Sequence, residues 1–314
     1  MKNKKSIMAV SAMLILIYHL WINITTSSIE VYLRQLCVTG VDLFFFVSAY
    51  SIASRKDINY KSFISNRFKN IYFKFFIFSI IGAFYLKWNL EKFFKTIIGI
   101  QLIERGGGSF LWFLPGVMLV YFILPLYKKI DEKYPKIVPI LAIIIYLLSS
   151  ISLSLFTNIK ALFILLNRIP IILLGYYFAK YKIIEKLSKN KSIYFLVLII
   201  TLISGILISY YGYINHFRVE WLRDIIYIVL IPLNIGLILL LNKINENKVI
   251  KLLSSITLEL YALQMIFGFK IANYIYKVIN LKLLSNVITI CVLILFSLIV
   301  NYILKKVPKL VKKN

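Results

Sequence analysis

The chain has 314 residues, 61% of them hydrophobic, and carries 38 Lys and Arg against 12 Asp and Glu, a formal net charge of +26. A soluble globular domain is closer to half apolar, so this composition excludes an ordinary water-soluble fold. The charges stand in short clusters between apolar runs, with no nucleic-acid-binding motif, which argues against a nucleic-acid partner and favours contact with lipid headgroups.

Apolar runs of the length that crosses a bilayer, about 20 residues, recur along the whole chain. We therefore predict an all-α polytopic membrane protein, a bundle of about ten transmembrane helices forming a single domain over residues 1–314. The predicted spans are Ser6–Ile24, Leu36–Ser54, Asn70–Lys87, Phe110–Tyr127, Ile137–Phe156, Lys160–Lys180, Ser192–Gly212, Leu222–Leu241, Ile256–Tyr276 and Leu283–Leu304. Phe93–Ile103 is too short to span with these and is predicted to be a short or re-entrant segment.

Lysines and arginines concentrate in alternate loops, on the side where the chain begins and ends. Examples are Lys4 and Lys5, Arg55 to Lys69, Lys128 to Lys136, Lys180 to Lys191, and Lys305 to Lys313. The positive-inside rule therefore places both termini in the cytoplasm, which agrees with an even number of spans. Cys37 and Cys291 form no CxxC or Cys/His spacing, so no metal site is predicted.

Polar residues inside predicted spans are the informative ones, because they are costly there and usually face a bundle interior. His19 lies near the outer end of the first span and Asp42 about two turns into the second, so the two side chains fall at a similar depth. One interpretation is a general base held by a carboxylate. The other is an interfacial histidine bonded to a neighbouring group.

Arg168 also falls in the outer half, within the sixth span. A buried guanidinium needs an acid or a bound anion, so Arg168 either pairs with Asp42 or binds a substrate oxygen. At the inner face, Arg67 and Lys69 belong to a basic patch that suits a phosphorylated cytosolic ligand, or that simply follows from topology. Glu259 and Gln264 lie in the ninth span and are candidates to line the same interior.

Several segments, taken in order, resemble membrane acyltransferase family 3. Gly40 to Tyr50 resembles its Gly-Val-Asp-x-Phe-Phe-x-x-Ser-Gly-Phe/Tyr signature, and His19 stands where the family keeps a first-helix histidine. The other matching segments are Phe63 to Tyr72 (Arg-x-x-Arg), Leu111 to Leu114 with Leu124-Pro125, Arg168-Ile169-Pro170 with Gly175, and Ser255 to Gln264.

The resemblance implies an integral membrane O-acyltransferase that takes an acyl group, usually acetyl, from cytosolic acyl-CoA and passes it to a hydroxyl of a carbohydrate. It implies no bound cofactor, with acyl-CoA as the donor substrate. On this basis His19 is the catalytic base and Arg67, with Lys69 nearby, holds the CoA phosphates. Asp42 holds the imidazole, Arg168 or Ser48 steadies the oxyanion, and Gln264 lines the substrate site.

Two positions depart from the family pattern. Asn70 replaces the second arginine of Arg-x-x-Arg, and Gln264 replaces the late histidine. These losses motivate a second hypothesis, a non-catalytic membrane component of an envelope glycan pathway. A transporter is a third, although no inverted repeat supports it. The basic, Lys/Ile/Asn-rich composition favours a bacterial plasma membrane as the location.

Overall fold

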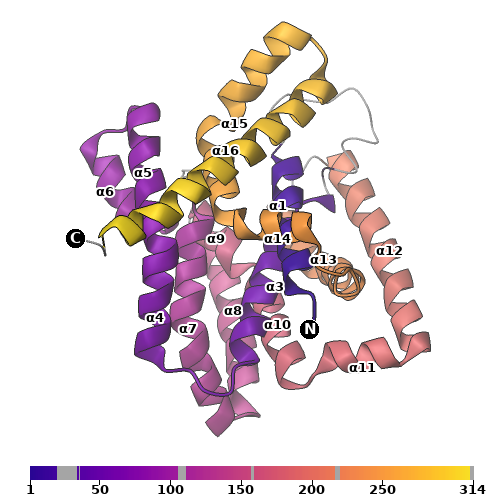
Figure 1. Cartoon of the computed structure of the whole chain (residues 1–314). Helices are drawn as coiled ribbons and strands as arrows, with labels where there is room; N and C mark the ends of the chain where they lie inside the picture. Colours follow the sequence, from indigo (N-terminus) through magenta and orange to yellow (C-terminus); the bar gives the residue numbers. More distant parts are fainter. Residues whose placement is uncertain (20–33, 35, 105–110, 157–158, 216–219, 312–314) are drawn as a thin grey trace.

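The computed structural model describes residues 1–19, 34, 36–104, 111–156, 159–215 and 220–311, and all regular structure in these residues is helical (Figure 1). The α-helices of the first half are α1 (Lys4–Tyr18), α3 (Thr39–Ala53), α4 (Tyr60–Arg67), α5 (Phe73–Tyr85), α6 (Leu90–Ile98), α7 (Phe113–Lys133) and α8 (Ile137–Phe156). Those of the second half are α9 (Lys160–Leu166), α10 (Ile169–Lys180), α11 (Ile183–Lys189), α12 (Lys191–Asn215), α13 (Glu220–Leu241), α14 (Lys248–Ser255), α15 (Thr257–Ile279) and α16 (Lys282–Val311). A π-helical turn, η1 (Phe68–Tyr72), joins α4 to α5, and a 3-10 turn, η2 (Ile100–Leu102), follows α6.

Helix α3 is the centre of the bundle and packs against α1, α7, α10 and α13 (Figure 1). Its sequence is apolar on every side, and 11 of its 15 residues are buried. A helix that is hydrophobic all round requires neighbours all round, which explains its central position. The residues of the family-like signature, Gly40 to Tyr50, lie in this helix.

Two glycines let the neighbours of α3 approach its backbone closely. A Cβ atom on Gly40 would lie 2.8 Å from the carbonyl oxygen of Ser11 in α1. A Cβ atom on Gly175 of α10 would lie 2.5 Å from the carbonyl oxygen of Phe46 in α3. Small residues at such contacts are typical of helices packed within a membrane, where close backbone approach provides much of the attraction.

Within the described residues, four helical segments are long and apolar enough to cross a membrane: Phe113–Lys133, Ala161–Lys180, Lys191–Ile208 and Lys282–Lys306. The pair α14 and α15, bent by 59°, makes a fifth if it is counted as one span. Every span predicted from the sequence overlaps a helix, but α1 and α3 have only 15 residues each and α5 has 13, short of the usual ~20. The multi-pass architecture is confirmed, whereas the number ten and the cytoplasmic termini stay predictions.

The segment Phe93–Ile103 is divided between α6 and η2, with a break at Gly99, whose φ is +83°. Helix α6 has nine residues and packs beside α5 as the second arm of a helical hairpin (Figure 1). A left-handed φ at glycine ends a helix without strain. This segment is therefore not a full span, as its length had indicated.

Candidate active site

The guanidinium of Arg168 and the carboxylate of Asp42 form a buried ion pair between α10 and α3. Arg168 Nε lies 2.6 Å from Asp42 Oδ1, and the two residues are 3% and 2% exposed. Asn234 of α13 donates a hydrogen bond from Nδ2 to the other carboxylate oxygen, at 3.0 Å. Three helices thus meet at one carboxylate, and of the two alternatives for Arg168 the structure forms the pair with Asp42.

Arg168 reaches this position because the helix is interrupted beside it. Asn167 and Arg168 form a turn between α9 and α10, and Pro170 follows at the start of α10. Proline supplies no N–H to the preceding helical turn and fits the first turn of a new helix. From this turn the Arg168 side chain reaches Asp42 of α3.

His19 lies at the C-terminal end of α1 and bonds within its own helix. Its ring Nδ1 lies 2.8 Å from the carbonyl oxygen of Ile15. A carbonyl can only accept, so Nδ1 carries the proton and Nε2 keeps its lone pair. The expected hydrogen bond from the His19 ring to Asp42 is not formed, because Asp42 is engaged by Arg168 and Asn234. The Ile15 carbonyl fixes the imidazole tautomer instead.

Arg34 lies beside His19 and was not singled out from the sequence. Its Nε donates a 2.8 Å hydrogen bond to the carbonyl oxygen of Tyr18, and its guanidinium lies 5.9 Å from the Tyr18 ring centroid. The carbonyl end of a helix attracts positive charge, so Arg34 stabilises the last turn of α1. The sequence offered no signal for this contact, since Arg34 stood at the edge of a predicted loop.

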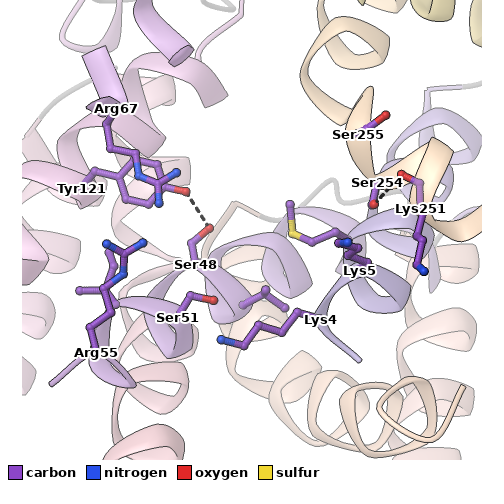
Figure 2. A pocket seen from close by; sticks show the side chains of 13 residues that line it. Lys4, Lys5, Ser48, Ser51, Arg55, Arg67, Tyr121, Lys251, Ser254 and Ser255 are labelled. Carbon is purple, nitrogen blue, oxygen red and sulfur yellow. Dashed lines mark hydrogen bonds between the residues drawn. The ribbon is translucent and has the colours of Figure 1, made fainter. Parts of the chain in front are cut away.

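A basic cavity of 380 Å³ opens at the other end of α1, and Figure 2 shows its lining. We call it the basic cavity; it is lined by Lys4, Lys5, Met8, Val47, Ser48, Ser51, Ile52, Arg55, Arg67, Tyr121, Lys251, Ser254 and Ser255. Five of these residues are cationic and four are serines, and none is acidic. Such a surface favours an anion with several oxygen acceptors, such as a phosphate ester.

Arg67 is the predicted site residue that the fold places in this cavity. Its guanidinium lies 4.8 Å from the Tyr121 ring centroid and 5.2 Å from that of Phe63. The hydroxyls of Tyr121 and Ser48 are hydrogen bonded at 3.2 Å (Figure 2). Ser48 therefore lies with Arg67 at the basic cavity, whereas Arg168, the other residue considered for the oxyanion, does not line it.

Lys69 does not line the basic cavity, contrary to its predicted association with Arg67. Two residues along a helix are rotated by roughly 200°, so the side chains face different directions. Lys69 instead borders an open groove of 420 Å³, together with Tyr60, Lys61, Ile64, Ser65 and Phe68. Asn70 is exposed and donates from Nδ2 to the Asn66 carbonyl at 2.7 Å, so it does not line the cavity either.

A second, smaller space lies between the basic cavity and His19. It measures 30 Å³, and we call it the apolar pocket. Its lining consists of Ser11, Ala12, Ile15, Phe44, Ile71, Phe113, Leu114, Val117, Thr257, Leu258 and Tyr261. Ile15, whose carbonyl holds His19, is thus also part of this lining. The pocket brings α1, α3, α7 and α15 together at the middle of α1.

Gln264 is 1% exposed, and neither its Nε2 nor its Oε1 has a hydrogen-bond partner among the described residues. It lies on α15, three residues after Tyr261 of the apolar pocket, so the two side chains share a helix face. Glu259, at the start of the same helix, pairs with Lys74 of α5. A buried amide with unsatisfied donors and acceptors is destabilising, which indicates that Gln264 has a role beyond filling space in the core.

Most of the cavity lining was not predicted as a site. Lys4, Lys5, Ser51, Lys251 and Ser254 come from α1, α3 and α14, which are distant in sequence. Their only sequence signal was the excess of lysine in loops on one side. That signal gives the side of the membrane and carries no information on which lysines share a cavity.

The all-helical fold with its membrane-length apolar helices defines the protein as a multi-pass membrane protein. A family model for an acyltransferase domain, that of acyltransferase family 3, matches residues 8–306, nearly the whole chain. The chain belongs to this acyltransferase family. Comparisons with curated proteins and with solved structures give no match.

Proposed function

We propose that this protein is an O-acyltransferase of a bacterial plasma membrane. It moves an acetyl group from cytosolic acetyl-CoA to a hydroxyl of an envelope or exported carbohydrate. The family supports acyl transfer. The donor, the acyl group and the acceptor are our inferences from the arrangement of the basic cavity, the apolar pocket and His19.

The observation that carries the proposal is the order of these three features along one face of α1. Lys4 and Met8 line the basic cavity, Ser11, Ala12 and Ile15 line the apolar pocket, and His19 follows one turn later. Residues three and four apart share a helix face. From Lys4 to His19 the helix rises by roughly 22 Å, which separates an anion-binding end from a base-bearing end.

This order suits a donor with a phosphorylated end and a reactive thioester at the end of a long, thin arm. The nucleotide phosphates of acyl-CoA would bind at the basic cavity through Arg67 and its neighbours. The pantetheine arm would run past the apolar pocket, between α1 and α7, toward His19. At 30 Å³ that pocket must widen to admit the arm, so entry of the arm, as distinct from binding of the phosphates at the basic cavity, requires a small separation of these helices.

The chemistry follows from the tautomer of His19. With Nδ1–H donated to the Ile15 carbonyl, Nε2 is free to accept the proton of an acceptor hydroxyl. The hydroxyl oxygen attacks the thioester carbonyl, the C–S bond breaks, and the imidazolium returns the proton to the leaving CoA thiolate. An ester forms, free CoA leaves, and His19 ends neutral.

In this scheme Asp42 and Arg168 have a structural role and do not contact the reacting groups. Their ion pair fixes α3 against α10, which positions the walls of the passage. Gln264, one turn beyond Tyr261 on α15, offers unpaired amide groups to the acceptor or to the developing oxyanion. The structure thus favours Gln264 over Ser48 for the oxyanion role.

A non-catalytic role in an envelope glycan pathway is the second candidate. The observation that favours it is the loss of two family residues, the arginine at Asn70 and the histidine at Gln264. Asn70 faces away from the basic cavity and bonds Asn66 instead. Such a protein would support the pathway without transferring an acyl group itself.

Mass spectrometry of the envelope glycans tests the proposal. Four strains are compared: the intact strain, a deletion, and deletions that carry His19→Ala or His216→Ala at matched membrane abundance. His216 is the other of the two histidines in the chain, so its substitution is a matched control. We expect an acetyl ester to disappear in the deletion and with His19→Ala, and to return with His216→Ala. An ester restored by His19→Ala would contradict the catalytic role and favour the second candidate.

A further inference from the structure

Two arginines from different segments share one aromatic ring at the wall of the basic cavity: Arg55 lies in the loop after α3, and Arg67 is the last residue of α4. The guanidinium carbon of Arg55 and that of Arg67 each lie 5.2 Å from the ring centroid of Phe63. The two carbons are therefore separated by no more than twice that distance. Figure 2 shows both guanidiniums on the same side of the cavity, next to Tyr121.

Neither guanidinium is neutralised within the described part of the chain. Among the described residues no carboxylate forms an ion pair with Arg55 or Arg67; Asp57, two residues after Arg55, is exposed and pairs with neither. Glu246 pairs with Lys5 and Glu132 with Lys128. Like charges held side by side repel each other. A bound anion offsets this repulsion, so the site favours anion binding.

The aromatic ring helps to hold the pair in place. The negative face of a phenyl ring attracts a guanidinium, and stacking restrains its plane without using its N–H groups. No described atom accepts a hydrogen bond from either guanidinium. Each fork of donors is thus available to a planar or tetrahedral oxyanion, for which arginine geometry is well suited.

The backbone that carries Arg55 is fixed by a buried lysine. Lys128 of α7 is 8% exposed, and its ammonium donates to the carbonyl oxygens of Arg55 and, at 3.1 Å, of Lys56. Arg55 itself is exposed. The side chain therefore reaches solvent from an anchored segment, which lowers the entropy lost when it binds a ligand.

We propose that Arg55 and Arg67 together form a two-arginine clamp for a phosphate group of the acyl donor. This inference rests on the proposed function and names a donor-binding residue that the sequence motif does not contain. The second arginine of the motif is Asn70 of η1 here, and Arg55 supplies the missing guanidinium from the loop that follows α3. Phe63 is the common platform, and Lys128 is a positioning residue.

The test compares Arg55→Gln with Lys56→Gln in purified full-length protein. Lys56 is adjacent, exposed and outside the cavity lining, so its substitution removes the same charge without touching the clamp. The donors are acetyl-CoA and acetyl-pantetheine, which has the same thioester without the nucleotide phosphates. Binding is measured by isothermal titration, and transfer by release of free thiol.

We expect Arg55→Gln to weaken acetyl-CoA binding and raise KM about tenfold, as for one lost charge-assisted contact, with little change in kcat. With acetyl-pantetheine, Arg55→Gln should behave as the unsubstituted protein does. Arg67→Gln should show the same dependence on the donor. Lys56→Gln should alter neither donor by more than about twofold.

Unchanged acetyl-CoA binding in Arg55→Gln, while Arg67→Gln binds weakly, would overturn the clamp and leave the proposed function standing. Equal losses in Arg55→Gln and Lys56→Gln would also overturn it, since only general charge would then matter. A different result marks failure of the proposed function: unsubstituted protein that binds no acetyl-CoA at all. The two failures are therefore distinguishable.

Discussion

Arg168 and Asp42 are joined by a 2.6 Å contact between Nε and Oδ1, with both side chains almost fully buried. This contact links the start of α10 to the first turn of α3, and Asn234 adds α13 to the same carboxylate. The sequence had left this pair open as one of two alternatives for Arg168. The position of the pair away from the basic cavity indicates a structural role, which can be separated from catalysis.

Removing one partner of this pair is expected to be strongly destabilising. Asp42→Ala leaves the Arg168 charge buried without its carboxylate, at a cost of about 3–5 kcal/mol. The double variant Asp42→Leu/Arg168→Met removes both charges and should recover most of the loss. Thermal unfolding in detergent, followed by size-exclusion chromatography, measures this. A double variant less stable than Asp42→Ala would contradict a simple ion pair.

Close backbone approach to α3 predicts intolerance of Gly175→Ala. The added Cβ would lie 2.5 Å from a backbone oxygen, which cannot rotate away, so α10 must move. We expect a loss of about 1–3 kcal/mol, typical of overpacking. Gly205→Ala is the matched control, because its nearest atoms are side-chain carbons at 3.5 and 3.6 Å. Equal unfolding temperatures for the two variants would show that α3 and α10 are not packed this closely.

Filling the apolar pocket should block transfer without preventing donor binding. Ala12→Leu adds three carbons to the lining of a 30 Å³ space, between the basic cavity and His19. Transfer from acetyl-CoA should fall at least tenfold, while CoA affinity changes less than about twofold. Ala9→Leu is a matched control on the same helix, buried but outside both linings. Comparable activity of Ala12→Leu and Ala9→Leu would exclude the pocket as the route of the arm.

Substitution of Gln264 should lower the transfer activity without lowering the stability of the fold. Its amide atoms are buried without partners, so Gln264→Leu removes an unsatisfied polar group and should keep or raise stability by about 1 kcal/mol. If the amide binds the acceptor or oxyanion, transfer should nevertheless fall at least tenfold. Parallel measurements of unfolding temperature and transfer rate decide this. Lower stability would show that the amide has a structural partner, and full activity would remove Gln264 from the site.

Some predicted contacts failed for reasons of helix rotation. His19 and Asp42 were predicted to lie at similar depths, which stays a prediction. Depth leaves open which way each side chain points around its helix axis. The imidazole points to the Ile15 carbonyl, and the carboxylate points to α10 and α13. Arg67 and Lys69 were likewise adjacent in sequence but face different spaces.

The sequence alone determined the class of protein, because bilayer thickness makes apolar length a direct signal and every predicted span overlaps a helix. It also determined the family, through motifs whose order survives along the chain. Tertiary structure alone decided which charges meet. Lys4, Arg55, Arg67 and Lys251 are spread over four segments and reach one cavity only after α1, α3, α4 and α14 pack together. A lysine or arginine contributes to membrane orientation through the loop in which it lies, whatever the direction of its side chain. An anion-binding site, in contrast, requires several such side chains to point into one cavity.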